Sequence, residues 1–109
     1  MGMVEIKRFE VWLINLDPTI GSEIRKTRPC VVISPDEMLS LNTLIIAPLT
    51  SKGFKLPMRL HVNFEGKDGL ILCDQIRTID KRRLIKKMGS LTKSTCKELS
   101  GLLQEMFAY

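Results

Sequence analysis

The sequence predicts one small, mainly β domain: a compact barrel of five or six short strands with helices late in the chain. The chain has 109 residues, the length of one domain, so residues 1–109 are taken as a single unit. Short apolar stretches rich in β-branched residues alternate with turn residues through the first two thirds of the sequence, which is typical of strands. After residue 77 the apolar spacing changes to that of helices.

Five strands are expected from these stretches. They cover residues 9–16, 29–34, 43–49, 59–64 and 70–73. Pro29 opens the second strand, where its missing N–H costs least, and the β-branched third strand is expected to be buried on both faces. The fourth strand places His61 on its exposed face. Between the strands, residues 17–28 form a polar loop, residues 34–36 a turn that leads into a short helical turn, and residues 65–69 a hairpin turn.

Two helices are expected at the end of the chain. Asp80 is placed to cap a helix that runs through Lys87, with an acid in its first turn and lysines at its end, as the helix dipole favours. In the last segment Thr95 and Glu98 fit a capping box. This segment carries one apolar stripe at helical spacing, which consists of Cys96, Leu99, Leu102, Leu103 and Met106.

The chain is basic, and its positive charge is concentrated in one segment. Seventeen Lys and Arg against twelve Asp and Glu give a net charge of +5. Eight of the basic residues and a single acid fall between Arg77 and Lys97, so this segment carries +7. Such a density favours a polyanionic partner such as nucleic acid. The alternative is a solvated helical face that serves solubility.

Several classes of protein do not fit this composition. No apolar run approaches the roughly 20 residues that cross a bilayer, and the N-terminus has no signal-peptide pattern, so a soluble, cytoplasmic protein is expected. Cys30, Cys73 and Cys96 suit a reducing compartment and are expected to be small core residues. With one histidine, no carboxylate cluster and no Gly-rich phosphate loop, an enzyme would work through Arg, Thr, Ser, Asp or Gln, without metal or cofactor.

Side chains of these types cluster where the expected strands end. They are Ser22, Glu23 and Arg28 in the loop after the first strand, Thr50 and Ser51 at the end of the third, and Asp74, Gln75 and Arg77 at the end of the fifth. Hydroxyl, amide and guanidinium donors that converge on one rim of a barrel would stabilise a phosphodiester as it gains charge in a pentavalent state. The alternative is ordinary turn and capping chemistry.

Three segments in this order resemble the toxins of the MazF/Kid (PemK) family. They are Trp12-Leu13 with Leu16-Asp17-Pro18-Thr19, Gly21-Ser22-Glu23 and Arg28-Pro29-Cys30-Val31-Val32-Ile33-Ser34-Pro35; then Pro48-Leu49-Thr50-Ser51; then Asp74-Gln75-Ile76-Arg77-Thr78-Ile79-Asp80 with Arg83-Leu84. The resemblance covers about residues 7–107. Each motif is weak alone, but three in order at the family's spacing are specific.

The resemblance implies an SH3-like barrel of the MazF/CcdB type, with five to seven short strands, a C-terminal helix and one or two short helices, that forms a homodimer. It further implies a sequence-specific, metal-independent endoribonuclease that cleaves single-stranded mRNA as the toxin of a type II toxin–antitoxin pair. Its partners would be the RNA and an acidic, MazE-like antitoxin that wraps the active groove.

Carried over residue by residue, Arg28 matches the family's catalytic arginine and Thr50 its partner threonine. The implied reaction is attack of the ribose 2′-hydroxyl on the adjacent phosphorus, which leaves a 2′,3′-cyclic phosphate and a 5′-hydroxyl. Ser22 or Ser51 would add a donor to the non-bridging oxygens. Asp74 matches the general base of the Kid branch, and a carboxylate accepts protons better than a guanidinium. Arg28 and Asp74 therefore both remain candidates for the residue that transfers the proton.

RNA binding is expected at seven residues of the loops and the rim: Glu23, Arg25, Lys55, Leu56, Pro57, Gln75 and Arg77. Those at 55–57 match the flexible loop that flanks the RNA groove in relatives, and a plain surface loop is the alternative. The chain departs from the family in three places. Many relatives have Gln and Gly where it has residues 24–26, and Kid-type members have His and Arg where it has Ser22 and Leu72. The Arg28/Thr50 mechanism is therefore preferred.

Three other functions are weighed against this one. A gyrase poison of the same architecture acts through a C-terminal Trp followed by Gly-Ile, whereas the only Trp of this chain is Trp12. A non-catalytic RNA-binding barrel would stack bases on exposed aromatic side chains. Four aromatic residues are expected to be structural instead: Phe9, Trp12, Phe64 and Phe107. An inactive relative kept as an antitoxin-binding regulator is disfavoured because the catalytic pair is present.

Overall fold

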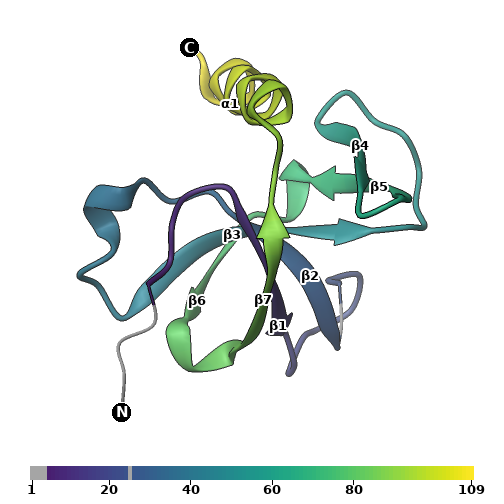
Figure 1. The fold of residues 1–109 in the computed structure, drawn as a ribbon. Helices are drawn as coiled ribbons and strands as arrows, with labels where there is room; N and C mark the ends of the chain where they lie inside the picture. Colours follow the sequence, from purple (N-terminus) through teal and green to yellow (C-terminus); the bar gives the residue numbers. More distant parts are fainter. Residues whose placement is uncertain (1–4, 25) are drawn as a thin grey trace.

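The chain folds as a curled antiparallel sheet with an α-helix at its C-terminal end, in a computed structural model that describes residues 5–24 and 26–109 (Figure 1). The strands are β1 (Glu10–Asn15), β2 (Thr27–Val32), β3 (Thr43–Thr50), β4 (Arg59–Phe64), β5 (Lys67–Leu72), β6 (Arg77–Asp80) and β7 (Leu84–Ser90). The helical elements are the single 3-10 turns η1 (Asp36–Met38), η2 (Cys73–Gln75) and η3 (Lys81–Arg83), and α1 (Lys93–Phe107). The mainly β class with a C-terminal helix is confirmed, with three short turns where one or two short helices were expected. Within the described residues, no helix is long and apolar enough to span a lipid bilayer.

β3 is the central strand because it pairs with three other strands. The sheet order is β4-β5-β3-β2-β1-β7, with β6 paired to β3 outside this path. Along one edge, residues 46–48 of β3 pair with β2. Along the other edge, residues 43–46 pair with β6 and residues 49–50 pair with β5. The turn η2 joins β5 to β6 and packs against β3. The stretch of β3 between these two partners contains Pro48, which has no N–H to donate to a neighbour.

The central strands are buried on both faces, so the protein has two apolar cores. Alternate residues of β1, β2 and β3 point to opposite sides of the sheet. In β2, Cys30 faces the first core, which Ile79 of β6 joins, and Val31 faces the second. Leu99 of α1 lies in the second core, and Figure 1 shows the helix toward the same end of the molecule as the β4–β5 hairpin. The expected two-sided burial of β3 is confirmed.

The β4–β5 hairpin is tighter than the sequence predicts. Its turn consists of Glu65 and Gly66 alone, with φ angles of 51° and 79°, and Phe64 pairs directly with Lys67. Two consecutive residues in the left-handed region are typical of a type I′ turn, whose twist matches that of the strands and lets pairing continue up to it. β5 therefore begins at Lys67, and the expectation of a turn over residues 65–69 is wrong.

The segment after residue 80 is a strand, so the helix expected from Asp80 to Lys87 is wrong. Asp80 does cap a turn, because its Oδ1 accepts a hydrogen bond from the Arg82 backbone N at 2.8 Å. That turn ends at Arg83, and β7 then pairs antiparallel along β1. Tertiary pairing overrides local propensity here, because without β7 the apolar strand β1 would be an open edge. The sequence analysis also missed β6, whose four residues pair with β3.

The helix α1 has the expected apolar stripe but a different cap. It begins at Lys93, and Thr92 is its N-cap, since Thr92 Oγ1 accepts a hydrogen bond from the Thr95 backbone N at 3.3 Å. Thr95 is thus the third residue of the helix, and the capping box at Thr95 is wrong. Leu99 is fully buried, and the later leucines of the stripe and Met106 pack against the second core.

The aromatic residues divide into three that pack in the cores and others that reach solvent. Trp12 is 6% exposed, and Phe9 and Phe64 pack against the second core, as expected. Phe107, in the last turn of α1, is 72% exposed. The expectation that Phe107 is structural is therefore wrong, because the stripe that faces the core ends one residue before it.

Gly69 allows β5 to approach β3, and its replacement tests how much the fold depends on this contact. A Cβ atom at Gly69 would lie 3.0 Å from the carbonyl oxygen of Thr50. We expect Gly69→Ala to lower the free energy of unfolding by about 1–3 kcal/mol, because the two backbones must separate. Urea unfolding followed by circular dichroism measures the change.

Gly101→Ala is the matched control, because a Cβ atom at Gly101 meets nothing within 4 Å. Alanine favours a helix over glycine, so this variant is expected to be as stable as the wild type or more stable by up to about 1 kcal/mol. If Gly69→Ala were as stable as the wild type, the close approach of the two strands would not constrain the fold.

Candidate active site

Two cavities adjoin along β3. The first, here called the loop pocket, has a volume of about 420 Å³ and is lined by residues 22–24 of the β1–β2 loop and by residues 74–77. The second, the strand pocket, has a volume of about 380 Å³ and is lined by β2, the end of β3 and the β4–β5 hairpin. Pro48 lines the first cavity, and Leu49 and Thr50 line the second. Consecutive residues of one strand thus form the boundary, and both volumes fall in the range of small-ligand sites, about 300–1,000 Å³.

The predicted rim residues fall into two neighbouring groups in these cavities. The loop pocket holds Ser22, Glu23, Asp74, Gln75 and Arg77. The strand pocket holds Arg28, Thr50 and Ser51. Lys55, Leu56 and Pro57 do not line either cavity and are exposed on the connection between β3 and β4. Arg25 lies outside the described residues.

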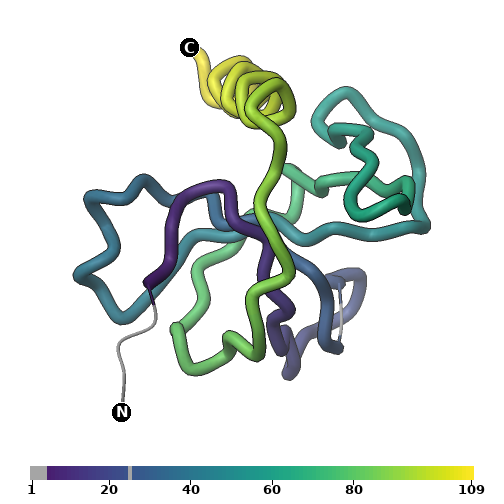
Figure 2. Tube along the Cα trace, in the orientation of Figure 1, coloured from purple at the N-terminus to yellow at the C-terminus, as the bar shows by residue number. Residues whose placement is uncertain are grey.

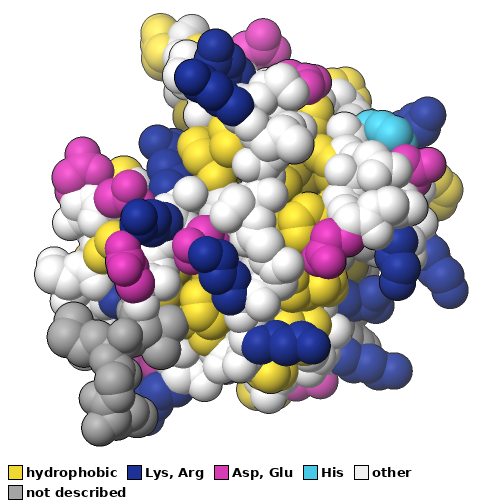
Figure 3. Space-filling view, in the orientation of Figure 1, with side chains coloured by type: hydrophobic (Ala, Val, Ile, Leu, Met, Phe, Trp, Pro, Cys, Tyr) yellow, Lys and Arg dark blue, Asp and Glu magenta, His cyan; other side chains and the backbone are white. Residues whose placement is uncertain are grey.

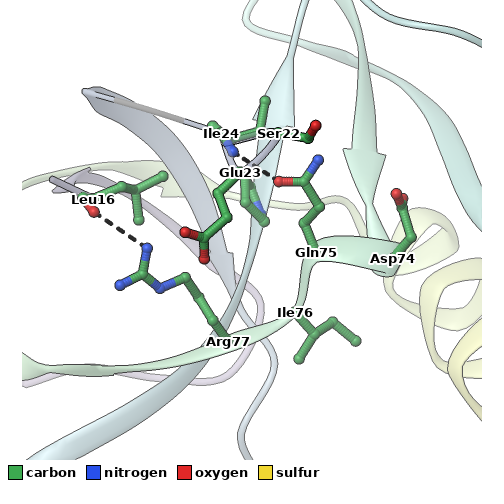
Figure 4. Close-up of a pocket in the computed structure, with 9 residues that line it drawn as sticks. Leu16, Ser22, Glu23, Ile24, Asp74, Gln75, Ile76 and Arg77 are labelled. Atoms are coloured by element: carbon green, nitrogen blue, oxygen red, sulfur yellow. Dashed lines mark hydrogen bonds between the residues drawn. The ribbon is translucent and has the colours of Figure 1, made fainter. Parts of the chain in front are cut away.

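Side chains from η2, β6 and η3 hold the β1–β2 loop over the loop pocket. Gln75 Oε1 accepts a hydrogen bond from the Ile24 backbone N at 2.8 Å, and Arg77 Nη1 donates to the Leu16 carbonyl oxygen at 3.2 Å, as Figure 4 shows. Arg83 Nη1 adds a hydrogen bond at 3.1 Å to the last carbonyl oxygen of β1. Gln75 and Arg77 therefore position the loop, each through one hydrogen bond to its backbone.

The polar groups of the loop pocket lie on two sides of Gln75. In Figure 4 the Glu23 carboxylate and the Arg77 guanidinium lie on one side, and the Ser22 hydroxyl and the Asp74 carboxylate lie on the other. Glu23 also accepts a hydrogen bond from a backbone N–H of its own loop, at residue 20. The Gln75 side chain therefore lies between an acidic and a basic group on one side and a hydroxyl and a carboxylate on the other.

In the strand pocket, Arg28 and Thr50 come from neighbouring strands. The register of β2 and β3 pairs Cys30 with Pro48, and the same register continued by two residues brings Arg28 beside Thr50. Thr50 is only 7% exposed, and its Oγ1 accepts a hydrogen bond from the Lys52 backbone N at 3.1 Å. Because a hydroxyl both accepts and donates, this bond leaves the Thr50 O–H able to donate to a ligand.

The positive charges of both pockets act on the same buried thiol. Burial raises the pKa of Cys30 to about 12, against the opposing effect of the charges on Arg77 and Arg28. Burial likewise raises the pKa of Cys73 to about 11. Both thiols are therefore protonated at neutral pH and are not nucleophiles, and their burial agrees with the expectation that they are core residues. Cys96 is only half-buried, so the same expectation is wrong for Cys96. One guanidinium from each pocket thus lies near the same part of β2.

Asp74 is held by an arginine that the sequence analysis did not single out. Arg59 Nε and Nη2 donate to the two carboxylate oxygens at 3.0 Å and 2.8 Å, and the side chains are 14% and 28% exposed for Arg59 and Asp74. These hydrogen bonds lower the pKa of Asp74 below its usual value, against a smaller opposite effect of burial. A carboxylate whose pKa is lowered and whose two oxygens are engaged is a weaker proton acceptor.

Sequence reasoning missed Arg59 and three residues of the hairpin that line the strand pocket. The three are Glu65, Lys67 and Asp68. Arg59 follows the alternation of its strand with His61, which suggests a plain exposed face. Its partner Asp74 lies 15 residues further along the chain, and only the register of β4 against β5 brings the two together. If the sequence analysis had predicted a two-residue turn at Glu65-Gly66, Lys67 and Asp68 would have been assigned to β5, the strand that pairs with β3.

Basic side chains gather along one edge of the molecule, and Arg28, Lys67 and Arg77 are the basic residues that line the two pockets. Figure 3 shows this gathering along the right-hand edge of the face drawn, over the region where Figure 1 places β2, β3 and β5. In the described ranges, 5–24 and 26–109, no group of three or more His, Cys, Asp or Glu side chains is placed to hold a metal ion. The arrangement offers guanidinium and hydroxyl donors on fixed strands, which is a chemistry suited to a phosphate ester.

The sequence matches a known family over nearly its whole length. The model of the family described as "PemK-like, MazF-like toxin of type II toxin-antitoxin system" matches residues 7–107. The protein named Endoribonuclease MazF in Staphylococcus epidermidis is 37% identical over 105 residues, which cover 90% of this chain and 88% of that protein.

Solved structures share the fold at lower identity. MazF (Form-I) from Deinococcus radiodurans has a TM-score of 0.82 at 22% identity and covers 95% of this chain and 97% of its own. An endoribonuclease in complex with its cognate antitoxin, from a mycobacterial species, has a TM-score of 0.77 at 17% identity and covers 93% of each chain. The family match and the staphylococcal relative together show that this chain belongs to the PemK/MazF family of toxins of type II toxin–antitoxin systems.

Proposed function

We propose that the protein is a sequence-specific endoribonuclease that cleaves single-stranded mRNA without a metal ion and inhibits translation as a toxin. The observation that carries this proposal is the placement of Arg28 and the Thr50 hydroxyl on adjacent strands of one pocket. The staphylococcal relative is named an endoribonuclease, which supports the same activity. The net charge of +5 favours RNA as the substrate.

In the proposed reaction the ribose 2′-oxygen attacks the adjacent phosphorus in line with the departing 5′-oxygen. The 2′-hydroxyl loses its proton as the O2′–P bond forms, and the 5′-oxygen gains a proton as the P–O5′ bond breaks. The products are a 2′,3′-cyclic phosphate and a 5′-hydroxyl. Thr50 donates its O–H to a non-bridging oxygen, Arg28 supplies positive charge, and Ser51 or Ser22 adds a donor. One preorganised donor of this kind contributes about 10²–10³-fold in rate.

Asp74 has a positioning role in this proposal. Its two oxygens accept hydrogen bonds from Arg59, and these bonds lower its pKa, which weakens it as a general base. The pair instead joins η2 to β4 beside the two pockets. The alternative, in which Asp74 takes the 2′-hydroxyl proton, requires Arg59 to release it first.

The proposed partners are the RNA, a second copy of the chain and an acidic antitoxin, in the cytoplasm. Glu23, Gln75 and Arg77 would contact the RNA in the loop pocket, and Arg25, which lies outside the described residues, is proposed as a further RNA contact. Lys55, Leu56 and Pro57 would contact it from the β3–β4 connection. The mycobacterial structure with its cognate antitoxin supports an antitoxin partner, and the basic charge of this chain favours an acidic one.

Cleavage of RNA in excess EDTA is the first test. A long single-stranded RNA is incubated with the protein, and the new 5′ ends are mapped by primer extension. Discrete cuts at a shared short sequence are expected with EDTA present, because fixed donors take the place of a metal. Activity that is lost in EDTA and restored by magnesium would overturn metal independence. RNA that is bound but not cut would identify a non-catalytic regulator.

Substitutions in the strand pocket test the catalytic pair. Arg28→Ala and Thr50→Val are each expected to lower kcat by about 100-fold or more, because each removes one preorganised donor from the charged transition state. Thr50→Ser keeps the hydroxyl and is the control expected to retain most of the activity. Unfolding midpoints establish that each variant is folded. A folded Arg28→Ala protein with near wild-type kcat would remove Arg28 from the mechanism.

The ion pair of Asp74 and Arg59 predicts a pH-dependent loss of stability. The folded-state pKa of Asp74 is lowered, so the stabilisation is fully present above the unfolded-state value, about 3.9, and is lost as the pH falls through the folded-state value. We expect Asp74→Asn to lower the free energy of unfolding by about 1 kcal/mol at pH 7 and to have less effect below about pH 4. Urea unfolding from pH 7 to pH 3 measures this.

A double-mutant cycle with Arg59→Gln separates the pair from other effects of the substitution. The coupling energy between the two positions is expected to shrink toward low pH together with the effect of Asp74→Asn. A coupling energy that stays constant from pH 7 to pH 3 would show that the charge of Asp74 does not contribute.

A further inference from the structure

The connection between β3 and β4 presents an exposed aromatic ring beside the strand pocket. This connection, residues 51–58, forms a wide arch at the edge of the molecule (Figure 2). Phe54 lies in the arch and is 82% exposed. The other strongly exposed aromatic residues, Phe107 and Tyr109, lie at the C-terminal end of the chain. A phenyl ring exposed to water is less stable than a buried one. An exposed ring next to a polar pocket therefore suggests that a ligand covers the ring when it binds.

The backbone that carries Phe54 is attached to both pockets. Arg59 Nη1 donates a hydrogen bond to the Phe54 carbonyl oxygen at 3.1 Å, and the same guanidinium binds Asp74 of the loop pocket through its other two nitrogens. A Cβ atom at Gly53 would lie 3.5 Å from Arg59 Nη1 and 3.7 Å from Thr50 Cγ2. The arch thus passes close to Thr50, and its backbone is fixed at the residue that carries the ring.

The charge around the ring suits a nucleic acid. Lys52 and Lys55 stand on either side of Phe54 in the arch and are exposed, and residues 51–58 contain no acid. Single-stranded nucleic acid is held by aromatic rings on which bases stack and by basic side chains that follow the phosphates. A ring between two lysines reproduces this pattern within four residues.

We propose that Phe54 is a base-stacking residue, on which an unpaired nucleobase next to the scissile phosphate stacks while that phosphate lies at Thr50. Arg59 and Asp74 are positioning residues that hold the backbone of Phe54 in place. The inference rests on the proposed endoribonuclease function and deepens it, because it adds a recognition element outside the two pockets. Since every base has a π face, this contact favours single strands over duplexes and leaves the sequence preference to the pockets.

A protein partner fits the same ring less well. The other large apolar residue exposed in the arch is Leu56, at 43%, and Lys55 stands between the two in the sequence. A stable protein interface buries about 800 Å² on each partner around an apolar centre. One nucleobase needs only the face of a single ring.

Fluorescence of the variant Phe54→Trp measures stacking directly. The probe is a single-stranded RNA with 2′-O-methyl groups throughout, which lacks the attacking hydroxyl and so reports binding without cleavage. The introduced indole is expected to be quenched when the RNA binds. The wild-type protein supplies the background, since its own Trp12 is 6% exposed. Arg59→Lys keeps the charge but cannot bridge Asp74 and the Phe54 carbonyl, and it is expected to reduce this quenching.

Phe54→Leu tests how much the ring contributes. Removal of one stacking ring is expected to raise the Kd for the methylated RNA about 5- to 100-fold. On cleavable RNA it is expected to raise KM by a similar factor with little change in kcat, because the ring does not touch the reacting atoms. Phe107→Leu makes the same substitution at an exposed ring in the last turn of α1, and it is expected to leave Kd, KM and kcat unchanged.

Three outcomes would overturn the proposal, and they are distinguishable. If the indole is not quenched and Phe54→Leu binds the methylated RNA like the wild type, Phe54 does not stack on a base, even where the wild type cleaves RNA. If Phe54→Leu binds RNA normally but loses the dimer in sedimentation, or loses affinity for an acidic antitoxin, the ring is a protein contact. If the wild type neither binds nor cleaves RNA, the proposed function fails and this proposal fails with it.

Discussion

The position of the site depends on the change of partner along one edge of β3. Over a few residues this edge passes from β6 to β5, and η2 joins those two strands beside it, so Asp74 and Gln75 face the loop pocket while Thr50 faces the strand pocket. Two local features permit this. Pro48 lies between the residues of β3 that pair with β6 and those that pair with β5, and it has no N–H that would be left without a partner there. Gly69 lets β5 approach the backbone of Thr50. Without this change of partner, the two pockets would not share a wall.

Arg59 links parts of the site that the chain brings together from three separate segments. Its guanidinium binds the carboxylate of η2 and the backbone of the β3–β4 arch, and the fork geometry of arginine is what allows one side chain to do both. The same bonds lower the pKa of Asp74. A carboxylate cannot serve as a fixed structural anchor and as a strong proton acceptor at the same time, so this geometry favours catalysis by positioned charge over catalysis by a carboxylate base.

Local patterns predicted the strands that lie in the cores, and they failed where tertiary pairing decides. The apolar stretches that became β1, β3 and β4 carry their own signal, and α1 has its stripe at helical spacing. β7 has lysines and a mixed pattern, so only its pairing with β1 identifies it as a strand. The candidate site likewise has a part that local motifs predict and a part that only the tertiary structure shows. Family motifs predicted Arg28, Thr50 and Asp74 as candidate site residues, but their division between two pockets and the contacts of Arg59 follow from strand register, which no single segment contains.

Both loops that border the pockets are held by hydrogen bonds from other parts of the chain, and this bears on how the proposed RNA substrate would meet them. The β1–β2 loop is bound from outside by Gln75, Arg77 and Arg83 and closed at its base, where the Leu16 N–H donates to the carbonyl oxygen of residue 26. The β3–β4 arch is held midway by Arg59. A loop with several anchors keeps its polar groups at fixed distances, as a charged transition state requires. The arch is also held at both ends, because the Lys52 N–H donates to Thr50 Oγ1 and the Cys73 N–H donates to the Met58 carbonyl oxygen. For the proposed RNA substrate, both loops thus present groups at fixed positions, and the proposed stacking on Phe54 starts from a backbone that is already in place.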